Sequence, residues 1–84
     1  MFDVLILNAR QKDHPEILFK GQAKSICLPG AEGEFEILDY HKPIMSRLKK
    51  GVIVVDNVTE LSIKDGIIKM DRQKFVAIVE TEKQ

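Results

Sequence analysis

Apolar residues in this chain occur in short runs rich in valine, isoleucine and phenylalanine, separated by polar residues and glycine. Runs of about four to eight residues bounded by turn-forming residues are typical of β-strands rather than helices. The pattern predicts an all-β fold, a two-sheet antiparallel β-sandwich of about eight to ten short strands. The predicted strands are residues 2–7, 17–19, 23–28, 35–38, 51–55, 59–63, 67–70 and 75–79.

The last third of the chain carries the strongest local signal. Asp65-Gly66 lies between two β-rich runs, and glycine tolerates the positive φ of a primed turn, so we predict a hairpin that turns at this pair. A polar turn at 72–74 then leads into the run 75–79. Because that run shows little alternation, we predict that the opposite sheet covers one face and a partner or crossing loop covers the other.

One segment departs from the β pattern. Ile44, Met45 and Leu48 recur at a spacing typical of a helix, and Gly51 follows them. Glycine commonly ends helices. The sequence therefore predicts a short helical turn within residues 43–50.

Size and charge limit the class of protein. The chain has 84 residues, which predicts a single domain spanning 1–84. Thirteen basic residues balance thirteen acidic ones, so the long-range field that draws nucleic acid to a protein is absent, and we expect no nucleic-acid partner. The first apolar run, residues 2–7, is too short to cross a membrane.

The sequence offers few groups for chemistry. Cys27 is the single cysteine, which excludes an internal disulfide, and we expect it to be a small buried hydrophobe within a strand. His14 and His41 are the only histidines, and nothing in their spacing places either beside a nucleophile. We expect no catalytic residue, no metal site and no cofactor. An acid–base pair of His41 with Asp39 is the least supported alternative.

The glycines at 30 and 33 could suggest a phosphate-binding loop. The Lys-Ser/Thr ending of such loops is missing, and Glu32 and Glu34 would repel a phosphate. Gly30 and Gly33 therefore predict a tight turn between two strands, with Ala31, Glu32 and Glu34 at its tip.

The middle of the chain carries an ordered set of short motifs. Residues 19–23 read FKGQA, residues 28–35 read LPGAEGEF, and HKP at 41–43 is followed by LKKGVI at 48–53. In order and spacing these segments resemble the epsilon subunit of F-type ATP synthases, whose pattern runs F-x-G, then PG-x-x-G-x-x-G-V-L-P-G-H-x-P, then L-K-x-G. The resemblance spans nearly the whole chain.

The resemblance implies a non-catalytic rotor subunit of the central stalk that binds the gamma subunit and the c-ring and couples proton translocation to ATP synthesis. It implies a place on the cytoplasmic face of an energy-transducing membrane, held there only through the complex. By position in the motifs, the residues expected at the c-ring are Ala31, Glu32 and Glu34, and those expected at the gamma subunit are His41, Ile44, Met45 and Ser46.

The chain departs from the family pattern at three places. Glu36 stands where the family usually has glycine, and Asp39-Tyr40 replaces its Pro-Gly before His41, so we expect this loop to follow a different backbone path. The family commonly continues into a helical hairpin that can inhibit hydrolysis and, in some members, binds ATP. No segment of these 84 residues corresponds to that hairpin.

A rival interpretation is a free-standing β-sandwich adaptor that binds a peptide. Such an adaptor would need an exposed edge strand, or an arginine cluster for a phosphorylated partner. The chain has three arginines, Arg10, Arg47 and Arg72, scattered along the sequence, which weighs against phosphopeptide binding.

Overall fold

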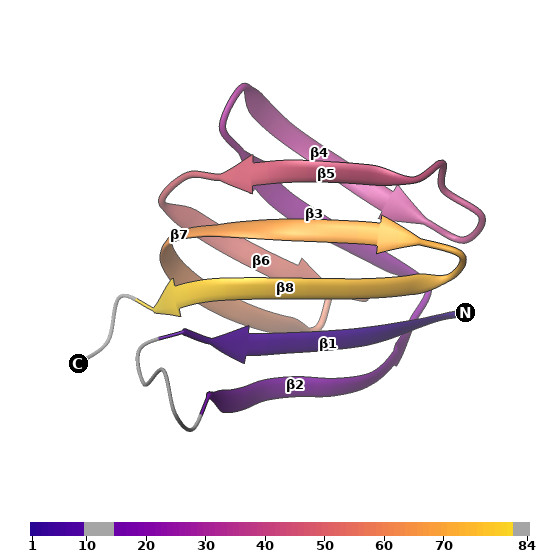
Figure 1. Ribbon diagram of the computed structural model, residues 1–84, viewed down its shortest axis with the longest axis horizontal. Helices are drawn as coiled ribbons and strands as arrows, with labels where there is room; N and C mark the ends of the chain where they lie inside the picture. Colours follow the sequence, from indigo (N-terminus) through magenta and orange to yellow (C-terminus); the bar gives the residue numbers. More distant parts are fainter. Residues whose placement is uncertain (10–14, 82–84) are drawn as a thin grey trace.

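The computed structural model describes residues 1–9 and 15–81, and this part of the chain is built of strands without a helix (Figure 1). The predicted all-β sandwich is therefore confirmed. The strands are β1 (Phe2–Asn8), β2 (Glu16–Ala23), β3 (Ser25–Gly30), β4 (Gly33–Leu38), β5 (Ile44–Leu48), β6 (Gly51–Val55), β7 (Thr59–Asp71) and β8 (Lys74–Thr81).

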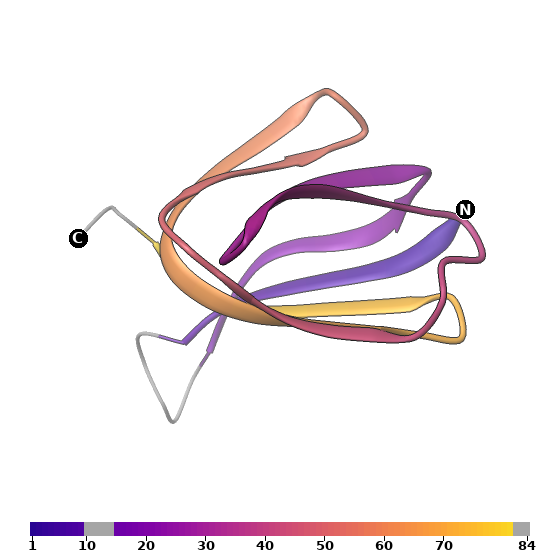
Figure 2. The same cartoon turned by 90° about the horizontal axis from the view of Figure 1, so that it is seen from above.

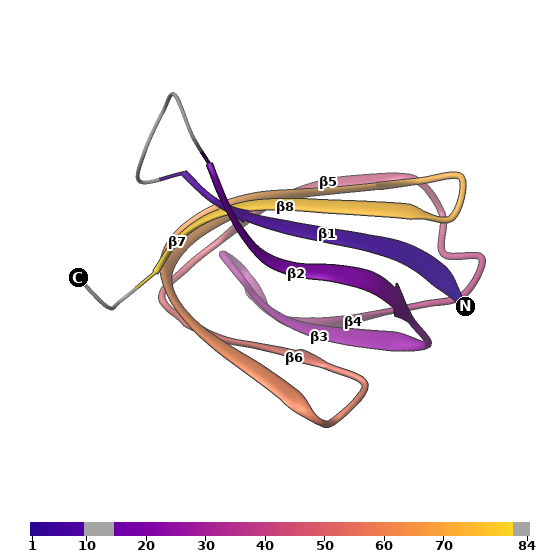
Figure 3. The same cartoon turned by 90° about the horizontal axis from the view of Figure 1, so that it is seen from below.

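The strands form two layers that share β7. Hydrogen bonds connect them in the order β2-β1-β8-β7-β5-β3-β4, and β6 pairs with both β3 and β7. The first layer holds β2, β1, β8, β5 and the C-terminal half of β7, and the second holds β4, β3, β6 and the N-terminal half of β7 (Figures 2 and 3). One pair differs from the antiparallel prediction, because β1 and β8 run parallel.

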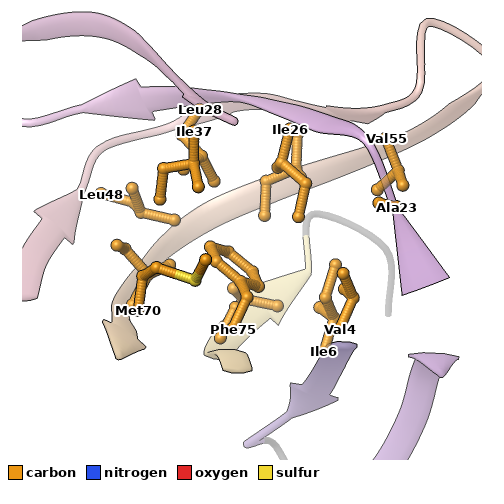
Figure 4. Packing of buried hydrophobic residues seen from close by; sticks show 14 of the residues in the cluster. Val4, Ile6, Ala23, Ile26, Leu28, Ile37, Leu48, Val55, Met70 and Phe75 are labelled. Atoms are coloured by element: carbon orange, nitrogen blue, oxygen red, sulfur yellow. The ribbon is translucent and has the colours of Figure 1, made fainter. Parts of the chain in front are cut away.

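The core lies between the two layers and follows from alternation along the strands. In β1 the buried side chains are Phe2, Val4 and Ile6, and in β8 every second residue from Phe75 to Val79 is buried. Figure 4 shows Val4 and Phe75 pointing toward Ile26 and Leu28 of the second layer. Burial of these aliphatic and aromatic groups is the main force that holds the layers together.

The predicted hairpin at Asp65-Gly66 is wrong, because β7 continues through this pair. The register shifts between Ile63 and Asp65, so the strand passes from one layer to the other here. A Cβ atom on Gly66 would lie 2.8 Å from Val79 Cγ1 and 2.9 Å from the Ile78 carbonyl oxygen. Glycine is therefore required at this position for the close approach of β8, not for a turn.

The chain reverses at two other places, each with consecutive residues of positive φ, as a primed hairpin turn requires. Asp56 and Asn57 have φ values of 53° and 58° between β6 and β7. Arg72 and Gln73 have φ values of 50° and 64° between β7 and β8, at the polar turn that the sequence predicts.

The predicted helical turn within residues 43–50 is also wrong, since this segment contains β5. Ile44 and Leu48 face the core, and Met45 between them is exposed. A separation of four residues fits one face of a strand as well as one face of a helix, so the spacing alone was ambiguous. Pairing with β7 from Ile44↔Met70 to Leu48↔Gly66 decides for the strand.

The predicted strand 23–28 is divided at Lys24. The Asp56 carboxylate oxygen Oδ1 accepts hydrogen bonds from the backbone N–H groups of Lys24 (2.7 Å) and Ser25 (3.0 Å). These bonds hold the corner at which the chain leaves β2 and enters β3. The strand predicted at 17–19 extends over all of β2, which pairs with β1 along its length.

Candidate functional site

The turn between β3 and β4 presents a short exposed tip, as the two glycines predict. Gly30 pairs with Gly33, and Ala31, Glu32 and Glu34 are exposed. Gly33 has a φ of 133°, which side-chain-bearing residues rarely adopt. Both glycines are therefore needed for the tip to hold its shape.

The structure brings this tip next to β5. The Ala31 N–H donates to the Arg47 carbonyl oxygen at 3.0 Å. A surface depression lies between the tip and β5, and it is lined by residues 30–35 and 45–47. This depression brings together residues that the sequence predicts as contacts for two different partners. Ala31, Glu32 and Glu34 are predicted for one partner, and Met45 and Ser46 for the other.

The remaining predicted contact residues lie apart from this depression. His41 belongs to the β4–β5 loop, at the far end of β4 from the tip, and its Nδ1 lies 2.8 Å from the Lys42 carbonyl oxygen. Ile44 is half-buried against the core. Ser46 donates its hydroxyl to the Arg47 carbonyl oxygen, and Met45 is 66% exposed. Among the three predicted contact residues on β5, Met45 thus offers the most apolar surface to a partner.

The alternative acid–base pair of His41 with Asp39 finds no support in the contacts of Asp39. The Asp39 carboxylate contacts the Met1 amine at 2.9 Å and accepts from Gln73 Nε2 at 3.0 Å. The hydrogen bond from the Met1 amine, followed by that from Gln73, lowers the pKa of Asp39. A carboxyl group held in its charged form in this way carries no proton to donate, so Asp39 is poorly suited to act as a general acid.

The outward side of the first layer carries an apolar surface that we call the outer apolar face. The run 75–79 alternates in burial: one face packs against the opposite sheet, and on the other Val76 is 36% and Ile78 is 44% exposed, so no described loop covers them and a covering partner stays a prediction. Cross-strand pairs extend this surface onto β1 and β7. The outer apolar face consists of Leu5, Leu7, Ile67, Val76 and Ile78.

Sequence reasoning did not place this face among the candidate contacts. Its signal was present in the uniformly apolar run 75–79, which pointed to a covering partner. Met45 lies on the same side, since it pairs with Lys69, which pairs with Val76. The outer apolar face and the depression at the tip therefore meet along β5.

Cys27 is half-buried on the outward side of β3 and is not the fully buried hydrophobe that the sequence predicts. It pairs with Glu36, whose Oε2 lies 3.9 Å from Sγ. Partial burial and then the negative charges of Glu36 and Glu34 raise the pKa of the Cys27 thiol. Because the thiolate is the reactive form, this environment makes Cys27 a poor nucleophile.

We expect Cys27 to react with Ellman's reagent at pH 8 more slowly than a free cysteine, because less of it is thiolate. Glu36→Gln removes a negative charge beside the sulfur and should raise the rate by roughly two- to fivefold. Glu60→Gln is the matched control, since Glu60 faces the same side from β7 but pairs with Val54 rather than Cys27. Equal rates for the protein and the free amino acid would contradict this account.

Within residues 1–9 and 15–81 there is no helix with the length and apolar character needed to cross a bilayer. This part of the chain also holds no group of three His, Cys, Asp or Glu side chains placed to bind a metal ion. His14 lies outside the described residues.

Comparison with known families decides where this sandwich belongs. Residues 14–82 match the family model of the ATP synthase delta/epsilon chain, β-sandwich domain. The chain belongs to this family. The ATP synthase epsilon chain of Campylobacter fetus is 37% identical over 68 residues, which is 76% of this chain and 53% of that one. The epsilon chain of a Sulfurovum species is 35% identical with the same coverage, so this family member spans about half the length of these relatives.

Solved structures show the same fold in this family. A chain of the Tetrahymena thermophila mitochondrial ATP synthase central stalk and c-ring superposes with a TM-score of 0.70 at 14% identity, covering 93% of this chain and 62% of that one. A chain of the Euglena gracilis mitochondrial ATP synthase gives a TM-score of 0.66 at 19% identity, covering 99% and 52%. At these identities the likeness concerns the fold.

Proposed function

We propose that this family member is a non-catalytic subunit of the central stalk of an F-type ATP synthase, which binds the gamma subunit and the c-ring and couples proton translocation to ATP synthesis. The observation that carries the proposal is the match of residues 14–82 to the delta/epsilon β-sandwich domain. The chain would be held at the membrane peripherally, through the complex alone.

We assign the gamma subunit to the side of the sandwich that carries β5. Support comes from the outer apolar face, because large exposed apolar surfaces on a small domain mark contacts with other proteins. Met45 adds an exposed apolar side chain at its border. The assignment also includes Ile44 and Ser46, whose side chains lie on the inner side of β5, and His41, which lies in the loop before this strand.

We assign the c-ring to the tip of the β3–β4 turn. Ala31, Glu32 and Glu34 are exposed there, and the Gly30↔Gly33 pair together with the hydrogen bond from the Ala31 N–H to the Arg47 carbonyl oxygen holds the backbone that carries them. Two carboxylates on a fixed loop suit a partner surface with basic side chains, because complementary charges select and orient a partner. A fixed loop also suits a rotor, since torque passes efficiently through stiff, closely packed contacts.

The test is co-purification of this chain with the gamma subunit from the same source, followed by the ATPase activity of the complex assembled with and without it. We expect one copy of the chain per gamma subunit and a change in activity or coupling on its addition. If a chain shown to be folded by circular dichroism does not bind gamma, the rotor assignment fails and the peptide-binding adaptor becomes the better explanation.

Glu34→Lys should weaken the coupling of proton flow to ATP turnover in reconstituted vesicles, because it reverses a charge at the proposed c-ring contact. Proton pumping measured against ATP hydrolysis reports this coupling. Glu60→Lys makes the same change at an exposed site on β7 in the second layer and should leave coupling intact. Unchanged coupling in the Glu34 variant would remove that residue from the contact.

A further inference from the structure

The β4–β5 loop holds a tyrosine in a backbone conformation that usually belongs to glycine. Tyr40 has a φ of 62°, and the chain reverses around it with the His41 N–H donating to the Leu38 carbonyl oxygen at 3.2 Å. Side-chain-bearing residues in this left-handed region carry a cost in free energy, and such costs gather at functional sites. The ring of Tyr40 is nevertheless 85% exposed.

The loop is fixed by the side chain of Gln73, which lies on the β7–β8 turn. Gln73 Oε1 accepts a hydrogen bond from the Tyr40 N–H at 2.6 Å, and Gln73 Nε2 donates to the Asp39 carboxylate at 3.0 Å and to the Met1 carbonyl oxygen at 3.3 Å. The Gln73 carbonyl oxygen in turn accepts from the Asp3 N–H at 2.8 Å. The Gln73 side chain therefore joins the loop to the β7–β8 turn and to Met1, and its backbone carbonyl joins the same turn to β1.

These three segments meet at one end of the sandwich, where the N-terminus, the β7–β8 turn and the β4–β5 loop lie side by side in the views of Figures 1 and 2. The backbone that carries Tyr40 is thus tied to the first layer through several bonds. A side chain on a fixed backbone loses less freedom on binding than one on a mobile loop. This geometry presents the ring outward in a defined place.

The fold itself gains little from this ring. With most of its surface in water, Tyr40 contributes little apolar burial, and glycine would occupy the same φ without strain. Its neighbours are exposed apolar groups, Met1 at 64% and Leu38 at 51%. Lys42, two residues on, is exposed, whereas Arg72 lies 3.8 Å from the Asp71 carboxylate and the Asp39 carboxylate is bound by the Met1 amine and Gln73.

We propose that Tyr40 is the anchor by which the β4–β5 loop binds the gamma subunit, seated in an apolar pocket of the partner with carboxylates at its rim. This inference rests on the proposed function. The chemistry follows from the loop: a phenol ring is a frequent centre of protein contacts, and the exposed ammonium of Lys42, two residues away, favours an acidic border. In this chain Tyr40 takes the part assigned to His41, whose ring Nδ1 lies 2.8 Å from the Lys42 carbonyl oxygen.

The test is the affinity of the purified gamma subunit for Tyr40→Gly and Tyr40→Asn, both of which fit a left-handed φ and should fold at least as stably as the wild type. We expect the dissociation constant to rise about tenfold or more in both variants, with no fall in melting temperature. Tyr40→Phe keeps the ring and should stay within about threefold of the wild type.

The outcomes separate the two claims. If wild-type chain binds gamma and both variants bind equally well, Tyr40 is not the anchor and the rotor assignment stands. If wild-type chain does not bind gamma, the rotor assignment and the inference fall together. Loss of affinity in Tyr40→Phe as large as in Tyr40→Gly would also overturn the inference, because the ring would then not be the group recognised.

Discussion

Replacing Phe75 by alanine is expected to lower the free energy of unfolding by about 3 to 5 kcal/mol, the range for truncating a large aromatic in a core. Phe75 is 1% exposed and lies on β8 between β1 and β7, where its ring packs within the cluster of Figure 4. A domain of this length has a total stability of roughly 4 to 13 kcal/mol. Urea unfolding followed by circular dichroism measures the change.

Val76→Ala is the matched control, because Val76 follows Phe75 on the same strand and faces solvent. It should change the free energy of unfolding by no more than about 0.5 kcal/mol in the isolated chain. The same variant should weaken binding to the gamma subunit if the outer apolar face is the contact. Equal destabilisation by both substitutions would mean that β8 does not alternate as described.

Gly66→Ala should lower the free energy of unfolding by about 2 to 3 kcal/mol, although alanine normally stabilises a strand relative to glycine. The added Cβ would meet Val79 Cγ1 at 2.8 Å, the Ile78 carbonyl oxygen at 2.9 Å and Val79 Cα at 3.2 Å. Two of these atoms belong to the backbone of β8, which cannot move without disturbing its ladder with β1. Chemical denaturation reports the loss.

The control for this substitution is Gly21→Ala on β2. The nearest atoms to its added Cβ belong to the Phe19 ring at 3.7 and 3.8 Å, which is ordinary van der Waals contact. We expect a change of no more than about 0.5 kcal/mol. A Gly66 variant as stable as this control would show that β7 and β8 can separate at the bend at little cost.

The order and approximate positions of most strands could be predicted because alternation of apolar residues is a local property. The predictions that failed concern segments whose local sequence fits either a turn or a strand, so that pairing with other strands decides between the two. Asp65-Gly66 has the composition of a hairpin turn, but β7 pairs with β6 on one side of it and with β5 and β8 on the other, so the strand continues. The primed turns lie instead at pairs without glycine: Asp56-Asn57, which the sequence did not predict, and Arg72-Gln73, which it did.

The candidate site was predictable to a similar degree. Gly30 and Gly33 indicated the tip at residues 31–34 because tight reversal needs glycine. No pattern in the sequence could show that this tip lies beside Met45, since that contact depends on the crossing of β5 over the end of β3. Nor could an apolar run reveal whether its second face is covered, because burial on that side depends on what packs there.

The parallel pairing of β1 with β8 also governs how this chain can fold while it is being made. Residues 3–8 pair with residues 74–79, so β1 must wait until β8 has been synthesised before one of its edges is filled. The pairs of β3 with β4 and with β6, and of β6 with residues 59–63, join residues that are closer in the sequence. Because distant pairings form slowly, the nascent chain carries the β1–β2 hairpin with an open edge until residues 74–79 leave the ribosome, and that interval is when it most needs protection from aggregation.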